Sequence, residues 1–212
     1  MQIKNRGAIT NPESRFETET REFYDDGWEV FDEEELPTLE TILYPDKAKS
    51  IINYNDSPDI GFDASINPYR GCEHGCIYCY ARPAHGYMNL SSGLDFETKI
   101  FYKVDAAKLL EQDLAKKKYV CEPIVIGANT DPYQPTESKL KVTRSILEVC
   151  HRYKQPIAII TKNAMIERDM DILSDMAKSN LVKVAVSITT LKTGLKILNL
   201  CWNHYLGAKQ GF

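Results

Sequence analysis

The sequence predicts an α/β protein in which strands and helices alternate along most of the chain. Three short apolar runs, at residues 123–128, 156–161 and 181–188, have the length and β-branched content of strands buried in a sheet. Together with an earlier strand and the helical patterns between them, they make about four βα units. Right-handed crossovers of this kind build either a doubly wound sheet or part of a barrel.

Residues 1–55 are predicted to form an acidic, largely irregular extension. Residues 1–50 carry 13 acidic and 6 basic side chains and contain Pro12, Pro37 and Pro45, with no sustained apolar period. Such acidic clusters are more typical of a solvated tail than of a functional patch. The folded domain is therefore expected to begin at about residue 56.

The first strand is expected at residues 62–68, where apolar and polar residues alternate up to Pro68 and lead into a cysteine-rich loop. A helix is predicted over residues 104–117, because apolar residues recur there at spacings of three and four. Two further helices are predicted at about 137–153 and 164–179. Both architectures place functional groups at the C-terminal ends of the strands.

Composition narrows the class of protein. The chain has 212 residues, of which 43% are hydrophobic and 26% charged, as expected of a globular protein with one main domain. No apolar run approaches the roughly 20 residues of a membrane helix, and no signal-peptide core is found near Met1. A cytoplasmic location without a membrane partner is the expectation. Outside the acidic extension the charge is nearly balanced, which neither supports nor excludes a nucleic acid as substrate.

Three of the six cysteines, Cys72, Cys76 and Cys79, lie within eight residues in a CxxxCxxC arrangement. This crowding is not a disulfide framework and indicates ligation of a metal or cluster. Gly71 and Gly75 precede the first two cysteines and would let the backbone wrap a bulky group. Three thiolates on an iron–sulfur cubane leave one iron open for a substrate or cosubstrate.

Zinc is the alternative metal that these thiolates could bind. It needs a fourth ligand, for which His74 and His85 are available. Zinc motifs more often come as two paired groups, and no second group follows in the sequence. The pattern therefore favours an iron–sulfur cluster and leaves zinc as the alternative.

The cysteine motif, with an aromatic residue before its last cysteine and a strand before it, resembles the radical SAM superfamily. Residues 57–72, 80–83 and 93–97 look like the bacterial branch related to spore photoproduct lyase, often labelled DNA repair photolyase. Arg6-Gly7-Ala8 and Asn11-Pro12 are similar to this branch as well. The resemblance covers roughly residues 50–191 and implies a partial (β/α) barrel of the radical SAM type, with about four βα units.

The resemblance implies cofactors and site residues. A [4Fe-4S] cluster on the three cysteines would reduce S-adenosylmethionine to methionine and a 5'-deoxyadenosyl radical, which abstracts hydrogen from a substrate. By position, Thr130, Lys162 and Ser187 are similar to the family's contacts to S-adenosylmethionine, and Tyr78 to an aromatic residue bordering the adenine. An electron donor such as a flavodoxin or ferredoxin is the implied partner, and the catalytic residue and the substrate stay unassigned.

Two departures from the family limit what is carried over. Asn129 stands where spore photoproduct lyase has a hydrogen-donating cysteine, so thymine-dimer repair is not expected. Residues 192–212 show no further strand and helix repeat, so we expect an incomplete domain at 56–191 followed by an atypical tail, as in a truncated or frameshifted product. The alternative function is then an inactive fragment that binds an iron–sulfur cluster or zinc. Nucleic-acid binding has little support beyond Lys116-Lys117-Lys118.

Overall fold

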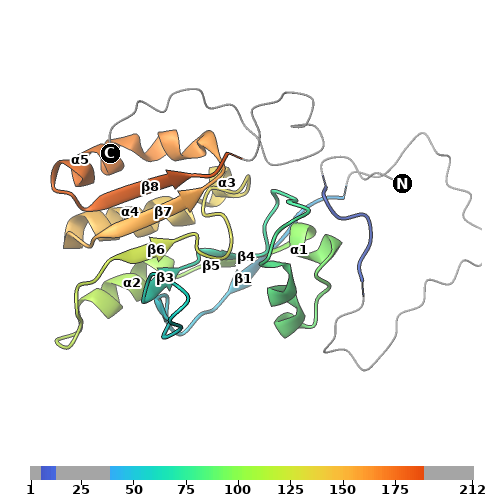
Figure 1. The fold of residues 1–212 in the computed structure, drawn as a ribbon, viewed down its shortest axis with the longest axis horizontal. Helices are drawn as coiled ribbons and strands as arrows, with labels where there is room; N and C mark the ends of the chain where they lie inside the picture. The colour runs from blue at the N-terminus through green and yellow to red at the C-terminus, as the bar shows by residue number, and fades with distance from the viewer. Residues whose placement is uncertain (1–5, 13–38, 189–212) are drawn as a thin grey trace, which may run out of the picture.

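The computed structural model describes residues 6–12 and 39–188, which form two sheets and their covering helices (Figure 1). The larger sheet has five strands in the order β2-β3-β6-β7-β8, and the smaller has three in the order β1-β5-β4. The expected α/β class is confirmed. The larger sheet is open in the described residues, so the partial-barrel arrangement stays a prediction.

Four strands of the larger sheet are parallel, and each was expected, the first from alternating apolar and polar residues and the other three from apolar runs. They are β3 (Ala64–Ile66), β6 (Ile124–Ile126), β7 (Ile157–Thr161) and β8 (Val182–Val186). The fifth strand, β2 (Asn53–Tyr54), adds antiparallel to β3 at one edge. Every residue of β6 is buried, as its continuous apolar run predicted, and every residue of β3 is buried as well, although its sequence alternates.

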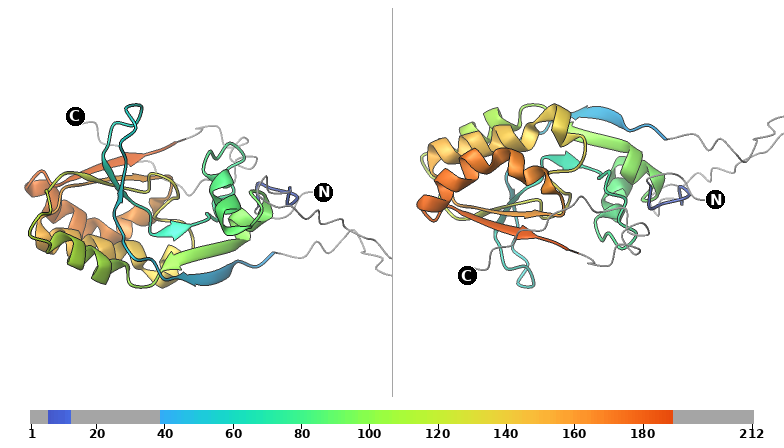
Figure 2. Two further views of the ribbon diagram at one scale, coloured as in Figure 1. Left: turned by 90° about the horizontal axis from the view of Figure 1, so that it is seen from below. Right: turned by 90° about the horizontal axis from the view of Figure 1, so that it is seen from above.

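Three helices lie side by side along one face of this sheet (Figure 2): α2 (Ala106–Leu114), α4 (Val142–Tyr153) and α5 (Met170–Lys178). Each turns a stripe of apolar residues inward, such as Ile146, Leu147 and Cys150 of α4. None of the helices in the part of the chain that the structure describes is long and apolar enough to cross a membrane.

Two of the expected helices begin differently from the prediction. The helix expected at 137–153 is divided into α3 (Glu137–Leu140) and α4, because Lys141 between them has a left-handed φ of 53°. The one expected at 164–179 begins as a 3-10 helix, η2 (Ala164–Asp169), before α5. Asn163 caps η2 by accepting a hydrogen bond from the Met165 amide at 2.9 Å.

The smaller sheet corrects the expectation that residues 1–55 are largely irregular. Strand β1 (Ile42–Asp46) pairs in parallel with β5 (Lys99–Lys103), and β4 (Tyr69–Arg70) pairs antiparallel on the other side of β5. Because β1 is an edge strand, it tolerates Pro45, which has no amide hydrogen to donate. Its partner lies far along the sequence, so no local pattern announces it. Residues 13–38 and the expected tail at 192–212 lie outside the described residues.

Two short helices complete the architecture around the cysteine loop: η1 (Arg82–Met88), a 3-10 helix, and α1 (Leu94–Thr98). The loop after β6 is anchored by a buried ion-pair network. Glu137, fully buried, accepts a hydrogen bond from Arg168 at 2.7 Å and one from the Tyr69 hydroxyl. Arg168 also binds Asp169, to which Tyr133 donates its hydroxyl hydrogen at 3.1 Å. These contacts tie α3 and the loop after β6 to η2 and β4.

Candidate functional site

The cysteine loop follows β4 and curls because two of its glycines adopt left-handed conformations. Gly71 has φ of 80° and Gly75 has φ of 61°, values that favour glycine. A Cβ on Gly75 would lie 2.9 Å from the Gly7 amide nitrogen, so the N-terminal segment packs closely against the loop. The Cys72 amide donates to the Phe96 carbonyl at 2.9 Å, and the Cys79 amide to the Cys76 carbonyl at 3.2 Å.

The three motif cysteines line one cavity of about 320 Å³. Cys72 is 7% exposed and Cys76 8%, while Cys79 is partly exposed. Cys72 and Cys79 are free thiols. Among the described residues, no group of three His, Cys, Asp or Glu side chains is arranged for a single metal ion.

The chemistry of this donor set fits an iron–sulfur cluster, since thiolates are the ligands that such clusters prefer. Burial, with a smaller contribution from the nearby Asp131 carboxylate, raises the pKa of Cys72 to about 12. This thiol is therefore protonated until iron displaces the proton, because the thiolate is the ligating form.

The other walls of the cavity come from the C-terminal ends of β6 and β7. They are formed by Gly127, Ala128, Asn129 and Asp131 after β6 and by Ile160, Thr161 and Lys162 at the end of β7. This confirms the expectation that the strand ends and the cysteine loop come together. Tyr80, from the loop, lines the same cavity and donates its hydroxyl hydrogen to the Ala128 carbonyl.

Asp131 organises this edge of the sheet. Its carboxylate accepts hydrogen bonds from the Thr161 hydroxyl at 2.7 Å, the Lys162 amide at 2.7 Å and the Tyr133 amide at 2.9 Å. His74 of the cysteine loop places Nε2 3.3 Å from Asp131 Oδ2. Burial alone would raise the pKa of Asp131, but these partners outweigh burial and hold the pKa below its usual value. Asp131 therefore joins the cysteine loop to two strand ends as a carboxylate.

Three of the four expected cofactor-binding residues come together at the end of β7. Lys162 Nζ donates to Ser187 Oγ at 3.1 Å and lies 5.8 Å from the centre of the Tyr78 ring. Lys162 and Tyr78 line the cysteine cavity. Ser187 does not line it, but its hydroxyl binds the ammonium group of Lys162. An ammonium group here is positioned to meet a carboxylate in the cavity.

The fourth expected residue, Thr130, is not brought to the cavity. Its side chain is 2% exposed, and its hydroxyl donates to the Tyr69 carbonyl at 2.7 Å. Asn129 and Asp131 line the cavity on either side of it, so the intervening side chain faces the core. The sequence predicted that this strand end contributes to the site. It did not predict which of the side chains at 129–131 face the cavity and which faces the core.

Glu97 is a residue of this region to which the sequence analysis assigned no role. It is 0% exposed, and its carboxylate accepts hydrogen bonds from the Gly7 amide at 3.0 Å, the Ala8 amide at 2.9 Å and Arg82 at 2.5 Å. Arg82 also donates to the Cys76 carbonyl at 3.1 and 2.9 Å. Glu97 thus connects the N-terminal segment to the backbone of a motif cysteine. The only signal in the sequence was that Gly7, Ala8, Arg82 and Glu97 all lie in segments that resemble the spore photoproduct lyase branch.

A second chain of hydrogen bonds runs from the same segment around the cysteine loop. Arg6 donates to the Thr41 hydroxyl at 2.9 Å, and that hydroxyl donates to Glu73 at 2.7 Å. Glu73 accepts a hydrogen bond from the Thr136 amide at 2.6 Å, and its own amide donates to Gln134 at 3.1 Å. The segment before β1 and the loop after β6 therefore both hold the cysteine loop in place.

The structure does not place His85 with the cysteines. It does not line their cavity, and its Nε2 lies 3.0 Å from the Lys99 carbonyl. A carbonyl only accepts, so Nε2 carries the hydrogen. Burial lowers the pKa of His85 and keeps the ring neutral. Of the two histidines offered for zinc, only His74 is near the thiols, where it contacts Asp131, so the arrangement gives zinc no added support.

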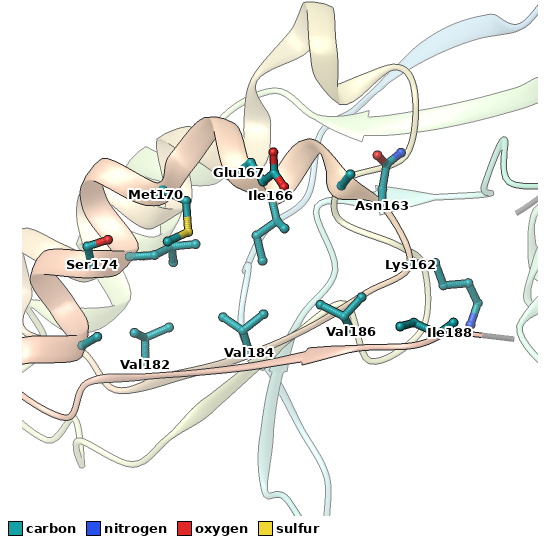
Figure 3. Close-up of a pocket in the computed structure, with 13 residues that line it drawn as sticks. Lys162, Asn163, Ile166, Glu167, Met170, Ser174, Val182, Val184, Val186 and Ile188 are labelled. Carbon is teal, nitrogen blue, oxygen red and sulfur yellow. The ribbon is translucent and has the colours of Figure 1, made fainter. Parts of the chain in front are cut away.

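An apolar cleft adjoins the cysteine cavity at Lys162. It has a volume of about 330 Å³ and lies between α5 and β8, an edge strand of the larger sheet. Figure 3 shows Val182, Val184 and Val186 on the side of β8 that faces this helix, across from Met170. With Lys162 in both walls, the apolar cleft and the cysteine cavity meet at one cationic side chain.

The sequence profile of the radical SAM superfamily matches residues 66–205 of this chain. The chain therefore belongs to the radical SAM superfamily. Members of this superfamily typically carry an iron–sulfur cluster and cleave S-adenosylmethionine, so membership suggests an enzyme.

Similar proteins share this domain without an assigned reaction. Uncharacterized proteins of Mycobacterium tuberculosis and Mycobacterium bovis are 35% identical over 127 residues, which cover 60% of this chain and 37% of each relative. An uncharacterized protein of Methanocaldococcus jannaschii is 31% identical over 150 residues, which cover 71% of this chain and 52% of that protein. The chain thus spans about half, or less, of the length of these relatives. No solved structure matches the chain.

Proposed function

We propose that this chain holds a [4Fe-4S] cluster through Cys72, Cys76 and Cys79 and cleaves S-adenosylmethionine to abstract hydrogen from a substrate. The observation that supports this most is that the three cysteines and the ends of β6 and β7 line one cavity. When bound, the cluster supplies one electron that splits S-adenosylmethionine into methionine and a 5'-deoxyadenosyl radical, which takes a hydrogen atom from the substrate.

The residues of the cavity have separate tasks in this proposal. Lys162 binds the carboxylate of S-adenosylmethionine, and Ser187 holds the ammonium group of Lys162 in place. Tyr78 borders the adenine with its ring. Asp131 positions Lys162 through its backbone amide and the cysteine loop through His74. Together these groups orient the cosubstrate and keep the thiol-lined end of the cavity away from water.

The electron comes from a separate one-electron donor, for which a flavodoxin or a ferredoxin has suitable chemistry. The resemblance of residues 57–72 to the spore photoproduct lyase branch supports a related reaction type. Asn129 has no thiol to return a hydrogen atom in the manner of that lyase. The proposal therefore includes radical generation and hydrogen abstraction, and not thymine-dimer repair.

The test is anaerobic reconstitution of the reduced chain with iron and sulfide, followed by dithionite and S-adenosylmethionine. We expect an iron–sulfur absorption band, about four irons per chain, and 5'-deoxyadenosine detected by chromatography. A cluster that forms without releasing the nucleoside would support the inactive-fragment alternative. Binding of zinc in preference to iron would overturn the proposal.

Lys162 and Thr130 give a matched pair of variants that tests the assignment of the cavity. In the reconstituted protein, Lys162→Met is expected to weaken binding of S-adenosylmethionine by about 10- to 100-fold, the value of one hydrogen bond to a charged group. Thr130→Val is expected to leave that affinity within about two-fold and to lower the free energy of unfolding by about 1 to 3 kcal/mol, since it leaves a buried carbonyl unpaired.

Calorimetric titration with S-adenosylmethionine and urea unfolding measure the two quantities. The assignment of Lys162 is wrong if its variant binds S-adenosylmethionine like the wild type. Weak binding by the Thr130 variant, at unchanged stability, would return Thr130 to the cofactor site.

A further inference from the structure

A second cavity lies next to the cysteine cavity, with Asn129 in the wall of both. It has a volume of about 280 Å³ and is bounded by β2, β4, the end of β5 and η1. Besides two tyrosines, its polar side chains are those of Asn53, Asn67, Arg70, His85, Lys103 and Asn129. No part of the radical-generating site described above uses this cavity.

Lys103 is the most informative of these residues, because its side chain is largely buried and lines the cavity. Its side chain is 5% exposed, and its ammonium group makes no hydrogen bond or ion pair with any of the described residues. Burial lowers the pKa of Lys103, Asp46 opposes this effect and Arg70 adds to it. Burying a charged ammonium is costly unless it is paired, so an anion in the cavity beside Lys103 would stabilise it.

The charges around the cavity leave an excess of positive charge. Arg70 Nε lies 3.1 Å from Asp46 Oδ2, and this carboxylate is the acidic group close to both Arg70 and Lys103. Among the residues that the structure describes, one carboxylate therefore faces two cations. His85 adds no charge, since burial lowers its pKa. An anion in the cavity would balance the remaining charge.

Neutral donors surround the same space. Asn67 Oδ1 accepts a hydrogen bond from the Asn129 amide at 2.8 Å, which occupies the acceptor end of the Asn67 side chain. The NH₂ groups of Asn53, Asn67 and Asn129 donate to no protein atom within the described residues. Amide donors beside an ammonium and a guanidinium make a set of groups that carboxylate and phosphate oxygens accept from.

We infer that this cavity binds an anionic group of the substrate, a carboxylate or a phosphate, on Lys103 and Arg70. The inference rests on the proposed function only in calling this ligand the substrate. Asn129 joins the two cavities, so a substrate anchored here extends toward the place where S-adenosylmethionine is bound. Lys103 is then a binding residue that fixes the substrate and leaves the reacting carbon free to face the other cavity.

The test is a calorimetric titration of the full-length, reduced, cluster-free chain with inorganic phosphate and, separately, with acetate, at constant ionic strength. Saturable binding of at least one anion is expected, and the stronger of the two identifies the anionic group. Lys103→Met is expected to weaken that binding by about 10- to 100-fold, the value of one charge-assisted hydrogen bond. Lys103→Arg, which keeps the charge, should restore most of the affinity, and this variant also shows that the site has folded.

Lys108→Met is the matched control, because Lys108 is an exposed lysine of α2 away from the cavity. It should bind the anion like the wild type. The inference is overturned if neither anion binds saturably, or if Lys103→Met binds as well as the wild type. Because the titration needs neither cluster nor S-adenosylmethionine, its failure leaves the nucleoside assay unaffected. If the nucleoside assay fails while the anion binds, the anion site stands and its ligand is not a substrate of radical chemistry.

Discussion

Replacing Cys76 with alanine is expected to abolish the iron–sulfur cluster and, with it, the release of 5'-deoxyadenosine. The cavity offers three thiols, and a cubane held by two of them would expose a second iron to solvent and exchange. We expect the loss of nucleoside formation to exceed about 100-fold, since even groups that only orient a metal ligand cost about 10- to 100-fold when removed. Iron content, the absorption band and the nucleoside are measured on the same preparation.

Cys121→Ala provides the matched control for this prediction. Cys121 is a free, exposed thiol outside the motif, and it does not line the cavity. Its variant should keep the full iron content and the same yield of nucleoside. A Cys76 variant that keeps a full cluster would show that Cys76 is not a ligand, and the proposed ligand set would then be wrong.

Replacing Glu97 with glutamine is expected to destabilise the fold by about 3 to 5 kcal/mol, the usual cost of removing one partner of a buried ion pair. Arg82, whose side chain is mostly buried, would lose the carboxylate at 2.5 Å. Glutamine would also present an NH₂ group where the Gly7 and Ala8 amides now donate to carboxylate oxygens. Urea unfolding of the cluster-free chain measures the loss of stability.

A double-mutant cycle separates the ion pair from the rest of this network. Arg82→Met combined with Glu97→Gln should be less destabilising than the sum of the single changes, because the double variant leaves no unpaired buried charge. Glu122→Gln, an exposed acid elsewhere, should change the free energy of unfolding by less than about 0.5 kcal/mol. Additive effects of Arg82 and Glu97 would show that their contact contributes little.

The same variant tests whether the N-terminal segment supports the cluster site. Arg82 donates to the Cys76 carbonyl, so a displaced Arg82 is expected to loosen the cysteine loop as well as the fold. Reconstituted Glu97→Gln protein should therefore lose iron to a chelator faster than the wild type. The rates are compared without urea, at a temperature at which both proteins are folded. Equal rates of iron loss would limit Glu97 to a role in stability.

The sequence alone determined the parts of this protein that follow from local pattern. The four parallel strands were visible as one alternating segment and three apolar runs, and their helices as apolar stripes, because burial imposes a pattern on neighbouring residues. The cysteine spacing and Lys162 at the end of β7 were also legible, since parallel strands bring their C-terminal ends to one edge. These features define the class of protein and the place of its candidate site.

The tertiary structure decided what depends on partners distant in the sequence. Strand β1 exists through its pairing with β5, and Glu97 gains its role from Gly7 and Ala8. The inward-facing side chains after β6 were settled by packing, which turns Thr130 to the core and Asp131 to the cavity. Lys103 is an ordinary strand-end lysine in the sequence, and only the fold buries its side chain in the wall of a cavity. No periodic pattern in the local sequence predicts such contacts, because they are made between residues that meet only when the chain is folded.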